Sequence, residues 1–274
     1  TKRRYERGVA KSKTTNKPVI DLCAQYAANS EVDLNKLETF PNPEKYMAGQ
    51  EHRKIVAMHK DFESDFFYGN QSTNLEDIDG LATRFNKLST TIGNKGYQVT
   101  SAGGSTNLTS LYLVGFGDNG VNMFYPMGSE AGVTRIVKPQ ERVTDASGNA
   151  YYAYCVFNNW KVGMAMENYR NAFLRIANID TAALATYGSG SDTSPDLVGI
   201  AIRAMEKLDY LDPSLKYCWF GDETVLGWLK TMYYKTSNMN ITLEQAQDGM
   251  QKVRLGGIPV YKSTQIINTE SVVS

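Results

Sequence analysis

One long helical pattern, over residues 42–68, limits most strongly what this chain can fold into. Asn42 can cap the free backbone N–H groups, Pro43 suits the first turn, and Glu44 favours the positive helix end. Apolar residues then recur at spacings of 8, 3, 4 and 4, which fit one helical face, before Gly69 stops the pattern. At about 1.5 Å per residue the helix is about 40 Å long, so it should run across a molecule of this size. We expect its packing residues to be Met47, Ile55, Met58, Phe62, Phe66 and Phe67.

The charge of the chain is balanced overall and uneven locally. The 274 residues, enough for one large domain or two modest ones, contain 29 Lys and Arg and 29 Asp and Glu, a formal net charge of zero. Nucleic-acid binding as the main function requires a basic excess, which is absent. Residues 1–17, however, hold seven cationic side chains against one acidic residue, Glu6, a net charge of +6. This segment is either a solvated terminus or an arm that docks on a partner.

The cysteines and the hydropathy indicate the setting of the protein. Three cysteines without close spacing predict neither a disulfide framework nor a zinc site, and they favour a reducing compartment. No apolar run approaches the roughly 18 residues of a membrane span, and no signal peptide opens the chain. The first residue is Thr1, so we expect that the chain is trimmed or is part of a longer product.

The middle of the chain has a strand-rich pattern. Residues 110–114 and 121–125 read as two strands, and the turn Asp118-Asn119-Gly120 between them predicts a hairpin, because Asn and Gly tolerate positive φ. Residues 133–144 and 149–160 predict a second, longer hairpin, supported by alternation of side-chain type.

The last third of the chain returns to mixed helix and strand. A Gly- and Ser-rich linker is predicted over residues 187–195, followed by a helix after Pro195. Residues 217–220 read as a buried strand, Thr224 could cap a second helix, and Gly256-Gly257 predicts a hairpin. The fold class is therefore α+β.

Tests for chemical motifs give no catalytic, cofactor-binding or metal-binding residue. Residues 115–120 match GxGxxG, but a strand follows where a dinucleotide site needs a helix. His52 and His59 lie seven positions apart on one helix, about 10 Å, which is too far for one shared metal. The Asp-rich turn at 77–80 resembles part of a calcium loop, but the first and last ligand positions do not match. No cofactor is expected.

Four ordered segments carry a resemblance to a known family. Residues 61–85 read DFESDFFYGNQSTNLEDIDGLATRF, and this string resembles the end of the long spine helix in major capsid proteins of tailed bacteriophages, in the podovirus-like branch of the Hong Kong phage capsid fold. Residues 110–132, 151–180 and 256–273 resemble later segments of the same proteins in the same order, including a Tyr-Pro-x-Gly turn, an Arg-Ile-Ala-Asn-Ile string and an Asn-Thr-Glu string.

The resemblance implies a specific domain organisation. It implies a remnant of an extended loop and N-terminal arm over residues 1–40, and a peripheral domain of long β-hairpins over 41–180 with the spine helix at 42–68. An axial α/β domain would cover 181–262, and residues 263–274 would form a closing strand of the peripheral domain. The aromatic rings at the end of the spine helix would anchor it to the peripheral sheet.

The resemblance also implies a function. The chain would be a structural shell protein, a late protein without enzyme activity, that self-assembles into pentamers and hexamers of an icosahedral capsid around double-stranded DNA. Its expected partners are other copies of itself, portal, scaffolding and decoration or cement proteins, and packaged DNA held by non-specific contact, with no membrane. The shell would be assembled in the host cytoplasm and end in the virion.

An assembly contact follows as a hypothesis. The basic arm on a neutral chain suggests pairing with acidic residues of an adjacent subunit. The candidate interface residues are Lys2, Arg3, Arg4 and Arg7 on the arm, and Glu76, Asp77 and Asp79 on the neighbour.

Two other functions remain open from the sequence. A cellular nanocompartment (encapsulin-like) shell protein would share the fold and enclose an enzyme in place of a genome. An α+β hydrolase or carbohydrate-binding protein would use some of the 17 Tyr, 10 Phe and 3 Trp to line a ligand groove. The scatter of these aromatics along every element favours core packing and subunit contacts.

Overall fold

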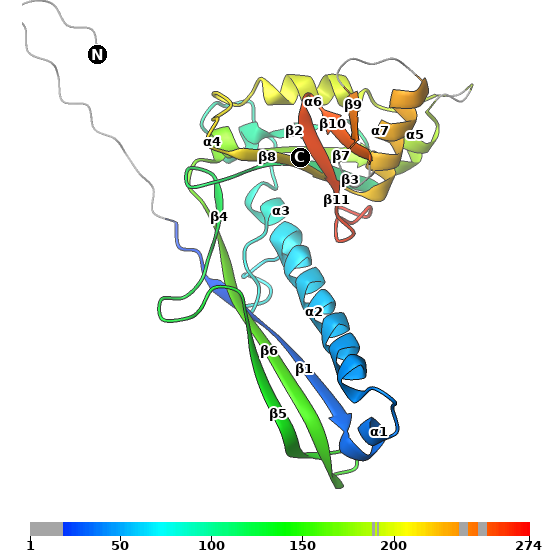
Figure 1. Ribbon diagram of the computed structural model, residues 1–274. Coiled ribbons are helices and arrows are strands. Elements are labelled where there is room, and N and C mark those ends of the chain that lie inside the picture. The colour runs from blue at the N-terminus through cyan, green and yellow to red at the C-terminus, as the bar shows by residue number, and fades with distance from the viewer. Residues whose placement is uncertain (1–18, 188–189, 191, 236–240, 246–250) are drawn as a thin grey trace, which may run out of the picture.

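The molecule has a compact part and an elongated part (Figure 1). The computed structural model describes residues 19–187, 190, 192–235, 241–245 and 251–274. Residues 1–18, and positions 188–189 and 191 of the linker predicted from the sequence, lie outside these ranges.

The elongated part is a β-ribbon with a long helix beside it (Figure 1). Strand β6 (Ala150–Met166) pairs antiparallel with β1 (Cys23–Asp33) along one edge and with β5 (Val133–Thr144) along the other. A short helix, α1 (Leu34–Glu38), turns the chain at the end of β1, and α2 (Pro43–Tyr68) then runs back along the ribbon. The long hairpin predicted around residues 133–160 is thereby confirmed.

Helix α2 has the ends that its sequence predicts. The side chain of Asn42 accepts a hydrogen bond of 3.0 Å from the backbone N–H of Lys45, and proline occupies the first turn. At the other end the N–H of Gly69 donates to the carbonyl of Asp65 at 2.9 Å, and the helix stops there. The helix predicted over residues 42–68 is therefore confirmed.

The burial of α2 differs between its two halves. Met58, Phe66 and Phe67 are buried in the second half, and Phe62 is half-buried beside them. In the first half only Met47 is buried, and Ile55 is half-buried. The helix is thus attached mainly by its C-terminal half.

The compact part contains most of the remaining elements. They are α3 (Leu81–Arg84), η1 (Lys95–Gln98), β2 (Val99–Ser101), β3 (Leu108–Phe116), β4 (Val121–Phe124), α4 (Tyr169–Ala172), β7 (Phe173–Asp180), α5 (Thr181–Ala185), α6 (Leu197–Met205), β8 (Lys216–Gly221), α7 (Glu223–Lys235), β9 (Ile241–Gln245), β10 (Gln251–Leu255) and β11 (Ile258–Lys262). Neighbouring strands follow the order β1-β6-β4-β3-β8-β11-β10-β9, so the ribbon and the compact part share one sheet, and β7 also pairs with β3. The predicted helix after Pro195, the strand at 217–220 and the hairpin through Gly256-Gly257 are confirmed.

The first predicted hairpin is wrong. Strand β3 pairs antiparallel with β7 on one side and β8 on the other, and it meets β4 only at Phe116 and Val121, in parallel. Every residue of β3 except Phe116 is buried, so the strand lies inside the sheet, and β7 and β8 occupy its two edges. Strand β4 instead pairs antiparallel with β6.

The predicted closing strand over residues 263–274 is also wrong. This segment makes only one isolated β-bridge, between Leu108 and Glu270. Near its end the backbone of Val273 pairs with a side chain, because its N–H donates to Asn178 Oδ1 at 2.9 Å and its carbonyl accepts from Asn178 Nδ2 at 2.8 Å. An asparagine side chain thus takes the place of a neighbouring strand.

The predicted cap of α7 is wrong too. The side chain that accepts a hydrogen bond at the start of this helix is Asp222, not Thr224.

The molecule has two apolar cores. One lies in the compact part, where Trp219, Trp228 and Leu229 pack among residues of β3, β7, β8 and α6. The other lies at the junction of the two parts, where Phe67 at the end of α2 packs with Tyr112 of β3. The second core fixes the direction in which the elongated part leaves the compact part.

Candidate assembly site: a rigid junction and an open arm

Aromatic rings join α2 to both parts of the sheet. The ring centroid of Phe67 lies 5.1 Å from that of Tyr112 and 6.0 Å from that of Phe220. On the ribbon, Phe62 lies 4.7 Å from Trp160 and 5.7 Å from Tyr26. Since each buried aromatic side chain removes a large apolar area from water, these contacts hold the end of the long helix against the sheet.

One carboxylate adjoins this aromatic contact. Tyr26 donates a hydrogen bond of 2.7 Å from its hydroxyl to Oδ2 of Asp65. Burial raises the pKa of Asp65, and the nearby carboxylates of Asp77 and Asp61 raise it further, while the bond from Tyr26 opposes them. The pKa of the Tyr26 hydroxyl is raised as well, first by burial and then by Asp65.

A buried polar network fastens the C-terminal segment to the junction. Glu270 Oε1 accepts from the hydroxyls of Tyr68 at 2.6 Å and Tyr112 at 3.1 Å. Its Oε2 accepts from Ser110 Oγ at 2.5 Å and from Arg175 Nη2 at 2.9 Å. One carboxylate therefore binds side chains from α2, β3 and β7.

The other donors of Arg175 are also used. Its Nη1 donates to the carbonyl of Phe85 at 2.8 Å, and its Nε donates to Ser110 Oγ at 3.1 Å. Burial acts to lower the pKa of Arg175, but the surrounding phenols and Glu270 raise it overall, so the guanidinium is charged. Burial raises the pKa of both Tyr68 and Tyr112, which keeps these hydroxyls protonated as donors to Glu270.

The loop after α2 brings the predicted acidic residues together. Asp79 accepts a hydrogen bond of 3.1 Å from the N–H of Gln71, and Asp77 accepts one of 2.7 Å from Asn74 Nδ2. Glu76 is exposed. The three carboxylates thus share one loop, and two of them also close it. The basic candidates Lys2, Arg3, Arg4 and Arg7 lie outside the described residues.

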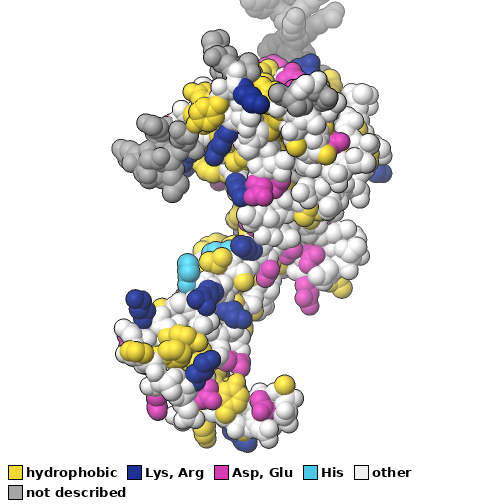
Figure 2. Space-filling view, turned by 90° about the vertical axis from the view of Figure 1, so that its right-hand side faces the viewer, with side chains coloured by type: hydrophobic (Ala, Val, Ile, Leu, Met, Phe, Trp, Pro, Cys, Tyr) yellow, Lys and Arg dark blue, Asp and Glu magenta, His cyan; other side chains and the backbone are white. Residues whose placement is uncertain are grey.

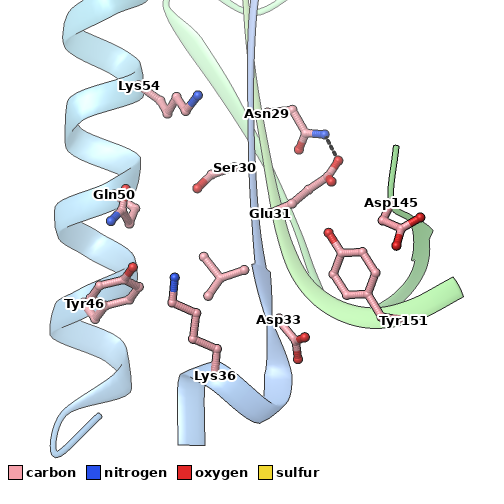
Figure 3. A pocket seen from close by; sticks show the side chains of 11 residues that line it. Asn29, Ser30, Glu31, Asp33, Lys36, Tyr46, Gln50, Lys54, Asp145 and Tyr151 are labelled. Atoms are coloured by element: carbon pink, nitrogen blue, oxygen red, sulfur yellow. Dashed lines mark hydrogen bonds between the residues drawn. The ribbon is translucent and has the colours of Figure 1, made fainter. Parts of the chain in front are cut away.

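The first half of α2 stands beside a groove (Figure 3). The groove has a volume of about 850 Å³ and lies between this helix and the end of β1. Lys54 extends from α2 toward β1, and Ser30 points toward the helix from the strand (Figure 3). Tyr46 and Gln50 line the groove on the side of the helix. Such an open space beside a helix contrasts with the close aromatic packing of its second half.

A second, apolar depression lies at the start of α2. It has a volume of about 470 Å³, and most of its wall is apolar, although the side chains of Asn42, Lys45, Gln50 and Arg53 also line it. Phe40 and Tyr46 form part of this wall and stack with ring centroids 4.0 Å apart. The elongated part therefore exposes concave surfaces that the described residues do not fill.

The motifs that suggested small-molecule chemistry do not form a site. Residues 115–120 lead from β3 into β4, not into a helix. Both His52 and His59 are exposed, and His59 packs edge-on against Trp160 at 5.4 Å. Within the described ranges, no group of three His, Cys, Asp or Glu side chains is arranged to hold a metal ion.

Among the described helices, none has the length and apolarity that crossing a bilayer requires.

No pattern in the sequence identified the residues that hold the junction. Arg175 and Glu270 occur in two of the segments that carry the resemblance, but nothing in their spacing shows that they pair. Trp160 was not singled out, although a large aromatic in an alternating strand is a signal for the buried face.

A long helix on an open ribbon, joined rigidly to a compact domain, defines a structural protein. Its exposed elongated part suits contact with further subunits. A family model described as major capsid protein GP7 matches residues 1–274, and the chain belongs to this family. A chain from a solved structure of bacteriophage Epsilon15 is similar, with a TM-score of 0.66 and 25% sequence identity. The match covers 100% of this chain and 81% of that one. A comparison with curated proteins found no match.

These findings confirm the resemblance and the α+β phage capsid fold. The protein is a structural shell protein of a bacteriophage capsid, located in the virion, and not an enzyme. The comparisons do not favour the nanocompartment, the hydrolase or the carbohydrate-binding protein.

Proposed function

We propose that this shell protein assembles into pentamers and hexamers, and that these close into an icosahedral capsid around double-stranded DNA. The observation that supports this most is the uncovered ribbon of the elongated part. Ile136, Tyr152 and Phe157 are 50%, 55% and 36% exposed on it. Apolar side chains in such numbers on one extended element mark a surface that binds other subunits.

The two parts would have different positions in the ring. Residues 181–262 would form the axial domain near the ring centre, and residues 41–180 the peripheral domain that reaches the next subunit. Residues 1–40 would belong to the extended loop and arm, and 263–274 would return to the peripheral domain. The junction around Glu270 supports this division, because it gives every subunit the same angle between its two parts.

Contacts between subunits would combine apolar and charged surfaces. The arm residues Lys2, Arg3, Arg4 and Arg7 would pair with Glu76, Asp77 and Asp79 of an adjacent subunit. The net charge of +6 on residues 1–17 and the shared loop of the three carboxylates support this pairing. Each contact can be weak, since many copies act together in a closed shell.

Other partners would include portal, scaffolding and decoration or cement proteins, during assembly in the host cytoplasm. Packaged DNA would be held by non-specific contact, and the formal net charge of zero limits how strongly each subunit can bind it. No cofactor is part of this function.

Sedimentation and negative-stain imaging of the purified protein test the proposal. We expect megadalton closed particles with icosahedral symmetry, built from five- and six-membered rings. Particles isolated from infected cells should contain double-stranded DNA that resists nuclease until the shell is opened. A monomer or small oligomer at all protein and salt concentrations would reject self-assembly, and particles that always enclose an enzyme would favour the nanocompartment.

A further inference from the structure

The loop between β4 and β5, residues 125–132, has a fully exposed apolar tip. Met127 is 104% exposed, and Tyr125 in the same loop is 51% exposed. The loop projects from the side of the molecule opposite to α2 (Figure 1). A flexible, polarizable methionine at an exposed loop tip adapts easily to an irregular apolar site.

The apolar depression at the start of α2 has the matching chemistry. The stacked rings of Phe40 and Tyr46 form its wall together with Pro41, and Gly49 leaves it open, because no atom lies within 4 Å of where a Cβ on Gly49 would be. Figure 2 shows hydrophobic side chains on the lower part of the face that carries α2, with Lys and Arg side chains beside them. Aromatic walls favour the thioether of methionine, since sulfur–aromatic contacts are attractive.

The charges beside the two surfaces are complementary. Lys45 and Arg53 line the depression, and no carboxylate lines it. The loop carries Glu130 and no cationic residue. Among the described residues, none of these three side chains has an ion pair within the chain.

The β4–β5 loop and the start of α2 lie on opposite sides of the elongated part (Figure 1), so the loop of one molecule does not reach the depression of the same molecule. We propose that Met127 of one copy inserts into the depression lined by Phe40 and Tyr46 on a second copy, with Glu130 facing Lys45 and Arg53. The contact joins two different surfaces of the same chain, so it propagates from copy to copy and closes when the rotation fits a ring. This inference rests on the proposed self-assembly and names the surfaces that take part in it.

Cross-linking between introduced cysteines tests the contact directly. Met127→Cys and Gly49→Cys combined in one chain, treated with a short bismaleimide after assembly, should give a ladder of covalent multimers on a denaturing gel. Each single variant should give none, which controls for Cys23, Cys155 and Cys218. Particles of the combined variant that yield no more cross-link than the single variants would overturn the proposal.

Substitution at the tip gives an independent measurement. Met127→Lys should lower the yield of particles about tenfold or more, because in every copy a positive charge would enter a depression that Lys45 and Arg53 already line. Met127→Leu should assemble normally. Both variants should have the thermal stability of the wild type, since Met127 is fully exposed in the described structure. Wild-type yields from Met127→Lys would refute the contact.

A charge exchange separates this contact from assembly in general. Glu130→Arg and Arg53→Glu should each weaken assembly, by about fivefold or less for such exposed charges, and their combination should restore it. Absence of rescue would contradict the pairing of Glu130 with Arg53.

If wild-type subunits form shells but the cross-link fails, only the Met127 contact is rejected. If wild-type subunits form no particles and no cross-linked pairs at high concentration, the proposed function fails as well.

Discussion

Arg175 and Glu270 lie 95 residues apart in the chain and form an ion pair of 2.9 Å in which each side chain is 4% exposed. The pair joins the middle of the sheet to the last residues of the chain. Its remaining donors and acceptors are occupied by Ser110, Tyr68 and Tyr112 and by a backbone carbonyl. A buried ion pair with satisfied hydrogen bonds holds the segments that it joins in one arrangement. Here it restricts the angle at which the elongated part leaves the compact part.

Removing one partner of this pair should destabilise the subunit strongly. Glu270→Ala leaves the guanidinium of Arg175 buried without a counter-ion, a change that costs about 3–5 kcal/mol in comparable cases. We expect a large fall in the midpoint of thermal unfolding of the unassembled subunit, or loss of soluble protein.

Removing both charges should be less harmful than removing one. In the combined variant Arg175→Met with Glu270→Met no buried charge remains unpaired, so it should unfold at a higher temperature than Glu270→Ala. A combined variant less stable than Glu270→Ala would show that the pair itself, and not the unpaired charge, dominates.

Two glycines should respond oppositely to alanine. A Cβ on Gly80 would lie 2.6 Å from the carbonyl oxygen of Asp65 and 2.7 Å from the backbone of Phe67, so Gly80→Ala must displace the loop from the helix end. Gly49 lies inside α2 with open space around its Cα, so Gly49→Ala should stabilise by about 0.5–1 kcal/mol. Chemical denaturation of the two variants would measure both effects, and equal signs would contradict the close approach at Gly80.

The attachment of α2 should depend on the residues of its second half. Phe67 is 1% exposed, and Phe67→Ala should cost about 3–5 kcal/mol of unfolding free energy. Val56 is 39% exposed on the same helix, so Val56→Ala should change the stability by about 0.5 kcal/mol or less. Similar losses for both variants would contradict an attachment that depends on the buried face of the helix.

Local signals in the sequence predicted the elements whose partners are near in the chain. The bounds of α2 follow from Asn42, Pro43 and Gly69, which act within one turn of the helix ends. The β5–β6 and β10–β11 hairpins follow from turns whose strands are adjacent. In each case the physical cause lies within a few residues, so the pattern contains it.

The sequence failed where distant segments compete for the same partner. The turn at 118–120 favours a hairpin, but β3 gains more by pairing with β7 and β8 inside the sheet. Residues 263–274 have a strand-like pattern, but Asn178 provides the backbone partners of Val273. The Arg175–Glu270 pair needs the complete fold before its members meet, so no spacing rule could identify it.

The pH dependence of stability should contain a contribution from Asp65. Burial raises its pKa above the ordinary value of about 3.9, so folding favours the protonated form. Its contribution to stability is complete below about pH 3.9 and is lost as the pH rises through the higher pKa of the folded state. Asp65→Asn is neutral at every pH, and its amide oxygen can still accept from Tyr26.

We therefore expect Asp65→Asn to unfold at the same or a higher temperature than the wild type at pH 7, with the difference shrinking toward pH 3.5. Differential scanning calorimetry of the unassembled subunit at several pH values would measure this. A variant that is less stable at pH 7 and gains on acidification would reverse the sign and contradict the burial argument.

The basic arm should make assembly sensitive to salt. Arg3→Glu with Arg4→Glu removes two positive charges, adds two negative ones and places them near Glu76 of a neighbour, so particle formation should fall and should depend more strongly on ionic strength. Arg203→Glu with Lys230→Glu changes the net charge equally on exposed helices of the compact part and serves as the matched control. Light scattering during assembly at several salt concentrations would compare the two variants. Equal behaviour of both would attribute any defect to net charge, whereas an arm variant that forms normal shells at every salt concentration would show that the arm makes no ionic contact.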